Sequence, residues 1–415
     1  MKSLKNIYYE DLNIDQKRVV NSIPNGHSLV KGVAGCGKTA IAIHRIPTLI
    51  NHYLEDKEKI LLVTFNRYLI NYLKNYFENT AIQNKIFNKE YSNCLDVKTI
   101  DSLIYYYSKR IETKGVLEIV QPSQEREIVN KSIKIINRQY PEETIINESN
   151  FNFLAEEIDW IKSCGYTEYE IYQTVDRKGR MSIGDNKLQL SKNSSTRSAI
   201  FALYLEYQNI LAQNNLTDYK TRALNVLNAF ESGKIKPYQF KHIIVDECQD
   251  LTRVQLNIIK NCLKTNGSLL FLSDVAQSIY THSWLSVNPF SSIDLDMSGR
   301  SIILSKNYRT TYEIAQAAYS LFKNDNEISK YDDFVKPTAI ERHGDLPCYI
   351  HFPEFVDQLN YIVKKINTLS EHYNLKDIAI VAYSNSYLND IQKYLLEHHI
   401  DAIKVTNGTD NFEDD

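Results

Sequence analysis

Gly32-Val-Ala-Gly-Cys-Gly-Lys38-Thr39 is the most informative segment of this chain of 415 residues. It matches the pattern G-x-x-x-x-G-K-[ST], follows the apolar run Ser28-Leu-Val-Lys31 and precedes an apolar helical pattern from Ala40 to Tyr53. Glycines at these positions let successive backbone N–H groups point at phosphates, and the start of the next helix adds the positive end of its dipole. Lys38 should reach the β- and γ-phosphates of a nucleotide, and the Thr39 hydroxyl should bind Mg²⁺. A chance glycine-rich turn is the alternative, and the strand-loop-helix context argues against it.

The nucleotide-binding residues predicted from this loop are contiguous: Gly32, Val33, Ala34, Gly35, Cys36, Gly37, Lys38, Thr39 and Ala40. The loop predicts ATP and Mg²⁺ as ligands. By itself, however, it leaves kinases, GTPases and many ATPases open.

Strand and helix patterns alternate on both sides of the loop. Apolar strand patterns occur at 28–31, 60–64, 96–99, 242–245, 269–272, 302–304, 349–352, 378–382 and 403–405. Such alternation indicates an α/β fold with a parallel sheet. Residues 123–227 instead show helical spacing, broken by a polar stretch at 177–197 that we expect to be a loop. The expected organisation is a first lobe of residues 1–110 and 228–285, a helical insertion of residues 111–227, and a second lobe of residues 286–415.

Composition limits the class of protein without naming a partner. The net charge is −3 and the pI is about 6.4, which argues against a histone-like nucleic-acid binder but not against a motor with one basic groove. The six cysteines are scattered and show no metal-ligand spacing. No apolar stretch reaches the length of a membrane span, and the N-terminus has no signal-peptide pattern. The expected location is the cytoplasm, away from any membrane.

The run His242-Ile-Ile-Val-Asp246-Glu247-Cys-Gln-Asp250 narrows the chemistry. An apolar strand that ends in Asp-Glu places Asp246 near the Mg²⁺ shell and Glu247 near the γ-phosphate. Glu247 can there orient and deprotonate the attacking water. An acidic turn after a buried strand is the alternative. A third strand end carries Gln277, which can sense the γ-phosphate, although a glutamine at such a position is usually only solvated.

These segments, in this order, resemble the UvrD/Rep/PcrA-like branch of the superfamily 1 helicases. The motifs that carry the resemblance run from a Q motif through motifs I, Ia, Ib, II, III and IV: Leu12-Asn-Ile-Asp-Gln16, Gly32 to Thr39, Val63-Thr-Phe-Asn66, Lys98-Thr-Ile-Asp-Ser102, Asp246 to Asp250, Ser273-Asp-Val-Ala-Gln-Ser-Ile-Tyr280 and Leu304-Ser-Lys-Asn-Tyr-Arg309. The resemblance implies two RecA-like P-loop lobes, the first interrupted by a helical insertion and the second incomplete.

The resemblance also implies roles for individual residues. Gln16 would read the adenine edge, Tyr308 would stack on adenine, and Arg309 would reach the γ-phosphate from the second lobe. The implied catalytic residues are Glu247, Lys38, Gln277 and Arg309, and the implied metal-binding residues are Thr39 and Asp246. The implied DNA contacts are Thr64, Phe65, Asn66, Thr99, Tyr280, His282 and Trp284. In the insertion, Trp160 fits a core position, whereas Arg177, Lys178 and Arg180 fit either a DNA contact or a solvated loop.

The chain departs from the family pattern in several places. The run Thr281-His-Ser-Trp284 lacks the basic residues that normally follow motif III, and its aromatic ring stands two positions late. Ser273 replaces the usual glycine, and Ala40 stands where the family often has arginine. Residues 411–415 fall where motif V would begin, and motifs V and VI are absent. We therefore expect the second lobe to have an open sheet edge that a partner chain or further sequence would cover.

The resemblance leads to two function hypotheses of different classes. The first is an ATP-driven 3′→5′ helicase or translocase that acts on single-stranded or partly duplex DNA. The second is a nucleotide-gated DNA-binding subunit without unwinding activity, docked on a nuclease in a repair or phage-defence complex. RNA as the substrate is a third possibility, which no residue excludes.

Overall fold

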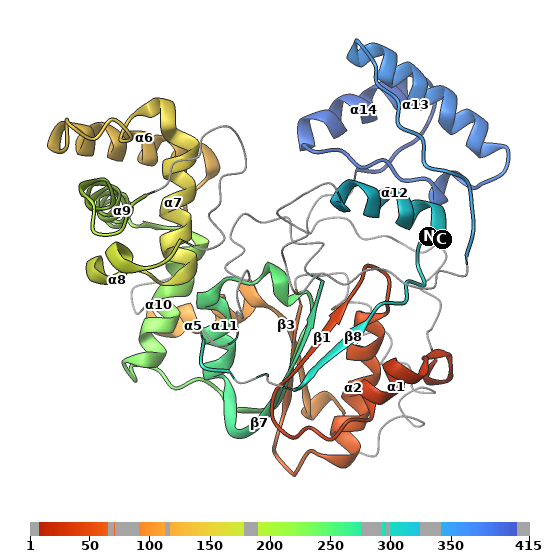
Figure 1. Ribbon diagram of the computed structural model, residues 1–415, viewed down its shortest axis with the longest axis horizontal. Coiled ribbons are helices and arrows are strands. Elements are labelled where there is room, and N and C mark those ends of the chain that lie inside the picture. Colours follow the sequence, from red (N-terminus) through yellow and green to blue (C-terminus); the bar gives the residue numbers. More distant parts are fainter. Residues whose placement is uncertain are drawn as a thin grey trace. The chain divides into compact units, whose positions relative to one another are not determined.

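The computed structural model describes residues 8–64, 70, 91–112, 117–177, 190–274, 290, 293–295, 297, 299–323 and 342–404 (Figure 1). The chain divides into two compact units. One unit is Asn13–His343, and the other combines Met1–Leu12 with Gly344–Asp415. The P-loop lies in the first of these units.

A six-stranded sheet organises the first unit, in the order β3-β2-β6-β7-β1-β8. All of its described strand pairs are parallel. The strands are β1 (Ser28–Gly32), β2 (Ile60–Thr64), β3 (Leu95–Thr99), β6 (Phe240–Val245), β7 (Leu263–Ser273) and β8 (Ser301–Leu304). The predicted parallel α/β fold is confirmed, as are the first five predicted strands. Because β7 lies between β1 and β6 and all three strands are parallel, the residues that follow them meet at the carboxyl end of the sheet.

Strand β8 joins the start of the predicted second lobe to the first sheet. Residues 302–304 were expected to open the second lobe, but β8 pairs with β1, with Val30 opposite Ile302. The backbone N–H of Val33 donates to the carbonyl oxygen of Leu304 at 3.1 Å, and Leu304 is buried. The free edge of β1 supplies the hydrogen-bond partners that this strand needs, so the first sheet extends past residue 285.

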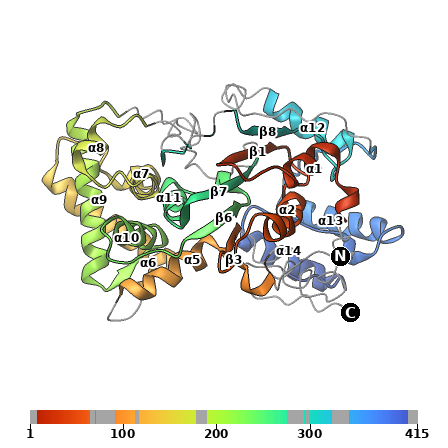
Figure 2. The ribbon, with the colours of Figure 1, turned by 90° about the horizontal axis from the view of Figure 1, so that it is seen from below.

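Helices cover both faces of the sheet (Figure 2). Helices α1 (Ile14–Val20) and α2 (Lys38–His52) lie on one side, and α5 (Ile100–Ile111), α10 (Tyr219–Glu231) and α11 (Arg253–Asn261) lie on the other. Alternate strand residues such as Leu61, Val63 and Ile243 join the core beneath α5, α10 and α11. The run from Ile60 to Val63 is apolar without interruption because both faces of a covered parallel sheet are buried.

The predicted helical insertion is formed by helices with a core of their own. The helices around this core are α6 (Pro122–Gln139), α7 (Phe151–Cys164), α8 (Tyr169–Thr174) and α9 (Ser195–Gln213). A short parallel ladder joins β4 (Glu118–Ile119) to β5 (Leu216–Thr217). Trp160 is 1% exposed in this core, which confirms its predicted structural role. The Arg253 guanidinium donates to the carbonyl oxygen of Cys164 at 2.7 Å and so ties α11 to the end of α7.

Two arginines of the predicted polar loop lie inside the insertion. Arg177 forms an ion pair with Glu157, whose side chain is fully buried. Arg197 belongs to α9 and donates to the backbone carbonyls of Tyr172, Gln173, Val175 and Leu190. The solvated or DNA-contacting role considered for Arg177 is therefore wrong, because its charge is neutralised within the protein. Lys178 and Arg180 lie outside the described residues.

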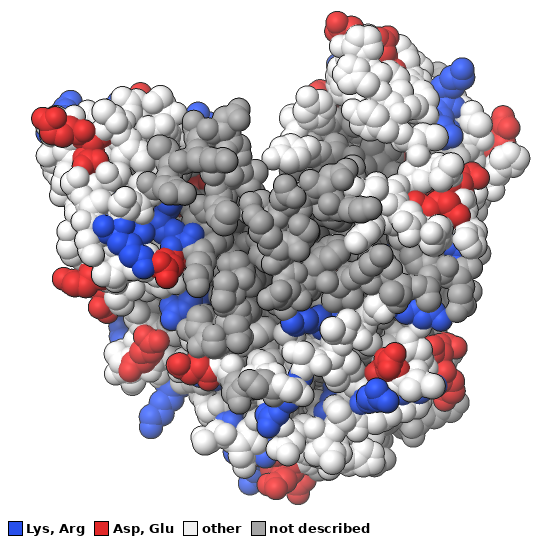
Figure 3. Space-filling model, viewed as in Figure 1, with Lys and Arg blue, Asp and Glu red and all other residues white. Residues whose placement is uncertain are grey.

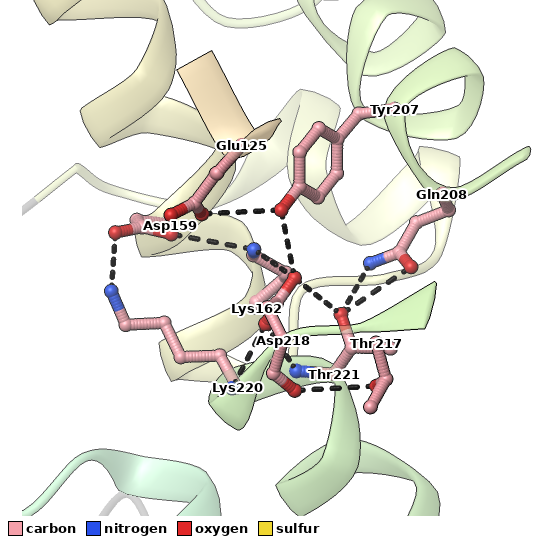
Figure 4. A network of polar contacts seen from close by, with 9 residues as sticks. All are labelled: Glu125, Asp159, Lys162, Tyr207, Gln208, Thr217, Asp218, Lys220 and Thr221. Carbon is pink, nitrogen blue, oxygen red and sulfur yellow. Dashed lines mark hydrogen bonds and ion pairs between the residues drawn. The ribbon is translucent and has the colours of Figure 1, made fainter. Parts of the chain in front are cut away.

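A buried polar network joins α6, α7 and α9 of the insertion to the start of α10 (Figure 4). The ammonium group of Lys162, on α7, lies 2.8 Å from a carboxylate oxygen of Asp218, the N-cap of α10, and 3.3 Å from Asp159. The Tyr207 hydroxyl, on α9, lies 3.0 Å from Asp218 and 3.2 Å from Glu125 on α6. Although burial alone would raise the pKa of Asp218, Lys162 and its hydrogen bonds hold that pKa at about 2. The network keeps the charged form of Asp218 in the core.

The second unit contains helices where strands were also expected. Its described helices are α13 (Phe355–Ser370), the short η9 (Leu375–Asp377) and α14 (Asn385–Glu397). Within residues 342–404, the predicted strands 349–352 and 378–382 do not form, and neither does the described part of 403–405. Ile378 and Ile380 pack against the helices, whereas Val381 is 93% exposed. The sequence pattern of a strand is present there, but no neighbouring strand pairs with it among the described residues.

The remaining elements complete the described chain. They are α12 (Tyr312–Lys323), η1 (Tyr9–Asp11), η2 (Tyr91–Asn93), η3 (Glu148–Asn150) and η4 (Cys248–Asp250). None of the helices in the described ranges combines the length and the apolar character that crossing a bilayer requires.

Candidate nucleotide site

The P-loop connects β1 to α2 and holds Lys38 in a buried position. Gly35 and Gly37 have positive φ angles of 73° and 87°, which glycine adopts without strain. Gly37 is the N-cap of α2 and provides no side-chain cap, so the helix start remains suited to an anion. Lys38 is 6% exposed, and its ammonium group donates to the carbonyl oxygens of Gly32 at 3.0 Å and Val33 at 3.3 Å. The loop thus presents its lysine at the carboxyl end of β1.

Oxygen atoms suited to Mg²⁺ meet beside the loop. The Thr39 hydroxyl lies 3.2 Å from a carboxylate oxygen of Asp246, which follows β6. Asp246 is 2% exposed, and burial together with the charge of Glu247 raises its pKa to about 6. A hydroxyl and a carboxylate are ligands that Mg²⁺ accepts, and a dication would favour the ionised carboxylate. These two residues therefore fit the predicted metal.

Glu247 stands next to this pair in an unusual backbone conformation. Its φ angle is +52°, in the left-handed region that non-glycine residues rarely adopt. Its backbone N–H donates to a carboxylate oxygen of Asp246 at 3.2 Å. The side chain of Gln249 donates to the Glu247 carboxylate at 2.7 Å.

Two residues of this site were not predicted from the sequence. Asp274 follows β7 and lies 3.3 Å from the Lys38 ammonium group, with both side chains buried. Gln249 is 4% exposed, and its side-chain oxygen accepts the backbone N–H of Asp274 at 3.0 Å. The available signal was the position of Asp274 directly after an apolar strand. Its partners depend on the order β1-β7-β6, which the sequence does not state.

The turn after β8 contacts the P-loop directly. The backbone N–H of Tyr308 donates to the carbonyl oxygen of Gly35 at 3.0 Å. The buried Asn307 side chain accepts the backbone N–H of Arg309 at 2.8 Å and so shapes the turn. Arg309 was expected to reach the nucleotide from the second lobe. It belongs instead to the unit that holds the P-loop, because β8 is a strand of that sheet.

Gln16 supports the P-loop from α1. Its side-chain oxygen accepts the backbone N–H of Asn13 at 2.8 Å, and its amide donates to the carbonyl oxygen of Cys36 at 2.8 Å. Asn13 also donates to the hydroxyl of Tyr308 at 2.5 Å, and the Tyr308 side chain is exposed. Gln16 and Tyr308, the two residues predicted to contact adenine, therefore lie on the same side of the loop. Their contact with adenine stays a prediction.

The predicted DNA contacts are described only in part. Thr64 and Thr99 pair across β2 and β3 at the ends of the strands. Thr64 is 1% exposed, which closes its side chain to direct contact in this conformation, and Thr99 caps α5 by accepting the backbone N–H of Ser102 at 3.1 Å. The other predicted DNA contacts, and the catalytic candidate Gln277, lie outside the described residues: Phe65, Asn66, Tyr280, His282 and Trp284. On the coloured and white surface of Figure 3, basic and acidic side chains are interspersed.

Two family models match the chain. The UvrD/REP helicase N-terminal domain matches residues 12–290. The UvrD-like helicase C-terminal domain matches residues 302–413. Together they span every motif described above.

Several curated proteins are similar to the chain over most of its length. A probable DNA helicase II homologue of Mycoplasma capricolum is 22% identical over 94% of this chain and 51% of the relative. The DNA helicase II of Haemophilus influenzae is 24% identical over 96% of this chain and 52% of the relative. An ATP-dependent DNA helicase Rep of Buchnera aphidicola is 27% identical over 94% and 57%. The chain spans about half the length of the curated relatives that it matches.

Proposed function

The chain belongs to the UvrD/Rep helicase family, and from this we propose that it hydrolyses Mg²⁺-bound ATP and uses the energy to move 3′→5′ along single-stranded DNA. The observation that carries the hydrolytic part of this proposal is the meeting of three strand ends. Three groups lie together at the carboxyl end of the sheet: Lys38 after β1, Asp274 after β7, and the pair Asp246-Glu247 after β6.

The residues of this chain divide the work of hydrolysis. Lys38 binds the β- and γ-phosphates with its ammonium group, at the open start of α2. Thr39 and Asp246 would hold Mg²⁺, which would supply positive charge to neutralise the phosphates. Glu247 accepts a proton from the attacking water. Arg309 stabilises charge on the γ-phosphate from the turn that contacts Gly35.

Recognition of the base and of DNA uses residues around this centre. Tyr308 stacks on adenine with its exposed ring, and Gln16 contacts the adenine edge. Gln277 reports the state of the γ-phosphate. Thr99 and the aromatic residues Phe65, Tyr280, His282 and Trp284 contact single-stranded DNA, where stacking on aromatic rings tolerates any base sequence.

Matched variants test the hydrolytic proposal. Lys38→Ala is expected to abolish ATP binding, and Glu247→Gln is expected to retain ATP binding while losing DNA-stimulated turnover. Lys134 and Glu148 form a surface ion pair with side chains 65% and 52% exposed, so Lys134→Ala and Glu148→Gln are the matched controls. Full turnover in the Glu247→Gln protein would remove Glu247 from its assigned role.

The second unit favours a second candidate function, a nucleotide-gated DNA-binding subunit that does not unwind. Extended segments of this unit carry apolar side chains that are almost fully exposed: Tyr349 at 92%, Val381 at 93% and Ile403 at 78%. Where such side chains form one contiguous patch, they mark a surface that binds another polypeptide. The partner would be another protein chain, such as a nuclease.

Two measurements separate these candidates. Nucleotide binding without ATP-dependent strand displacement by the purified chain would support the subunit, and strand displacement would support the motor. Melting of the isolated chain in one cooperative transition at high temperature, without aggregation, would argue against a required partner.

A further inference from the structure

A glutamine amide joins the ends of two strands beside the candidate base. Gln249 donates from its side-chain nitrogen to a carboxylate oxygen of Glu247 at 2.7 Å. Its side-chain oxygen accepts the backbone N–H of Asp274 at 3.0 Å. The side chain is 4% exposed, so water cannot easily replace either bond. One buried side chain therefore fixes the Glu247 carboxylate to the backbone at the end of β7.

Glu247 requires such a restraint if it is to act on water. Its side chain is only partly buried, and its backbone already holds the strained φ angle of +52°. A glutamate side chain has three rotatable bonds, so its carboxylate can point in several directions. A displacement of about 1 Å at a reacting group can cost roughly 100-fold in rate. The hydrogen bond from Gln249 favours one direction for the carboxylate.

The choice of an amide at position 249 matters for both bonds. A glutamate of the same size could not donate to the Glu247 carboxylate and would add a second negative charge beside it. A leucine of similar volume could make neither bond. The other end of the bridge is also defined, because the Asp274 side chain pairs with Lys38 at 3.3 Å and holds the end of β7 against the P-loop.

We propose that Gln249 is a positioning residue for ATP hydrolysis, which holds the Glu247 carboxylate in its water-activating direction by anchoring it to the end of β7. This inference rests on the proposed ATPase function. In this role Gln249 acts through the Glu247 carboxylate and not on the phosphates. Its loss should therefore affect turnover and leave nucleotide binding in place.

The test compares Gln249→Leu and Gln249→Glu with the unmodified chain of 415 residues. For both variants we expect the DNA-stimulated kcat to fall roughly 10- to 100-fold, with the Kd for ADP changed less than about twofold. The affinity for ADP with aluminium fluoride, which mimics the in-line transition state, should fall by a similar factor to kcat. Adding Gln249→Leu to Glu247→Gln should cause no further loss of turnover, because Gln249 acts only through the basic carboxylate that Glu247→Gln already removes.

Gln173→Leu is the matched control. Gln173 is 5% exposed in the insertion and bonds to the Ser198 hydroxyl at 3.0 Å, away from the P-loop. It should leave kcat and both affinities unchanged. A parallel loss of ADP affinity in Gln249→Leu, or an additive effect with Glu247→Gln, would overturn the positioning role. An active parent chain with an equally active Gln249→Leu variant would refute this inference alone, whereas an inactive parent chain would refute the proposed function and the inference together.

Discussion

The ammonium group of Lys38 lies 3.3 Å from the carboxylate of Asp274, and the two side chains are 6% and 4% exposed. The lysine of the P-loop is thus already paired with an anion of the protein. A nucleotide phosphate that binds Lys38 must compete with the Asp274 carboxylate for the ammonium group. The phosphate is also repelled by the negative charge of that carboxylate. Asp274 therefore sets part of the affinity of the site.

We expect Asp274→Asn to bind ATP more tightly than the parent chain. The substitution removes the competing charge and keeps the size of the side chain. A hydrogen bond to a charged group contributes about 1.5–3 kcal/mol, so the Kd for ATP should fall roughly tenfold. Titration with a fluorescent ATP analogue measures this change.

Asp294→Asn is the matched control for that experiment. Asp294 lies 3.4 Å from Lys260 in an ion pair, but its side chain is 93% exposed. Its loss should leave the Kd for ATP unchanged. Weaker ATP binding by Asp274→Asn would show that Asp274 supports the loop more than it competes with phosphate.

Gly35 tests the contact between the P-loop and the turn that carries Arg309. A Cβ atom at Gly35 would lie 2.5 Å from the Cβ atom of Arg309 and 2.6 Å from the side-chain oxygen of Asn307. Gly35→Ala should displace this turn and lower ATP turnover roughly 100-fold. Steady-state ATPase kinetics with single-stranded DNA present would detect it.

Gly233→Ala separates this clash from backbone strain. Gly233 has a φ angle of +71°, close to the 73° of Gly35, but nothing lies within 4 Å of its added Cβ atom. It should cost about 1–2 kcal/mol of stability and leave turnover unchanged. Equal losses of turnover in both variants would mean that the turn does not depend on its fit against Gly35.

Much of the first lobe could be predicted from the sequence because its signals are local. The P-loop is a contiguous pattern, and a parallel strand buried on both faces reads as an apolar run such as residues 60–63. Trp160 could be assigned to a core from the apolar face of a single helix. Each of these features depends on neighbours within a few positions along the chain.

The features that could not be predicted depend on strand order and on distant partners. Residues 302–304 have the pattern of a strand, but only the free edge of β1 decides which sheet they join. The polar sequence around Arg177 suggested a solvent-exposed loop. Its neighbours in the sequence do not indicate that Arg177 forms an ion pair with Glu157 in the core. Asp274 and Gln249 became site residues only once β7 was placed between β1 and β6.

The buried network of the insertion predicts a large loss of stability on removal of its central cation. Lys162→Met leaves Asp218 and Asp159 without their shared partner in a core position where the lysine side chain is 0% exposed. Breaking one side of a buried ion pair costs about 3–5 kcal/mol in the free energy of unfolding. Urea denaturation measures it. Lys134→Met, in the surface pair with Glu148, should cost less than about 1 kcal/mol, and equal losses for both lysines would contradict the structural role of the network.

His242, on the strand that leads to Asp246, predicts how stability depends on pH. Burial, with the nearby charges of Lys241 and Arg45, lowers its pKa to about 4 from an ordinary 6.5. Its ring nitrogens lie 2.8 Å from the Ser268 hydroxyl and 3.2 Å from the carbonyl oxygen of Tyr53, an arrangement that suits the neutral ring. Between pH 6.5 and 4 the unfolded chain binds a proton at His242 that the folded chain does not bind, so stability is lost as the pH falls through this window.

From pH 7.5 to 5.5 the parent chain should lose about 1.4 kcal/mol more in the free energy of unfolding than His242→Gln, which has no titrating group at this position. Urea unfolding of both proteins at the two pH values measures the difference, and equal losses would show that His242 takes up its proton in the folded state.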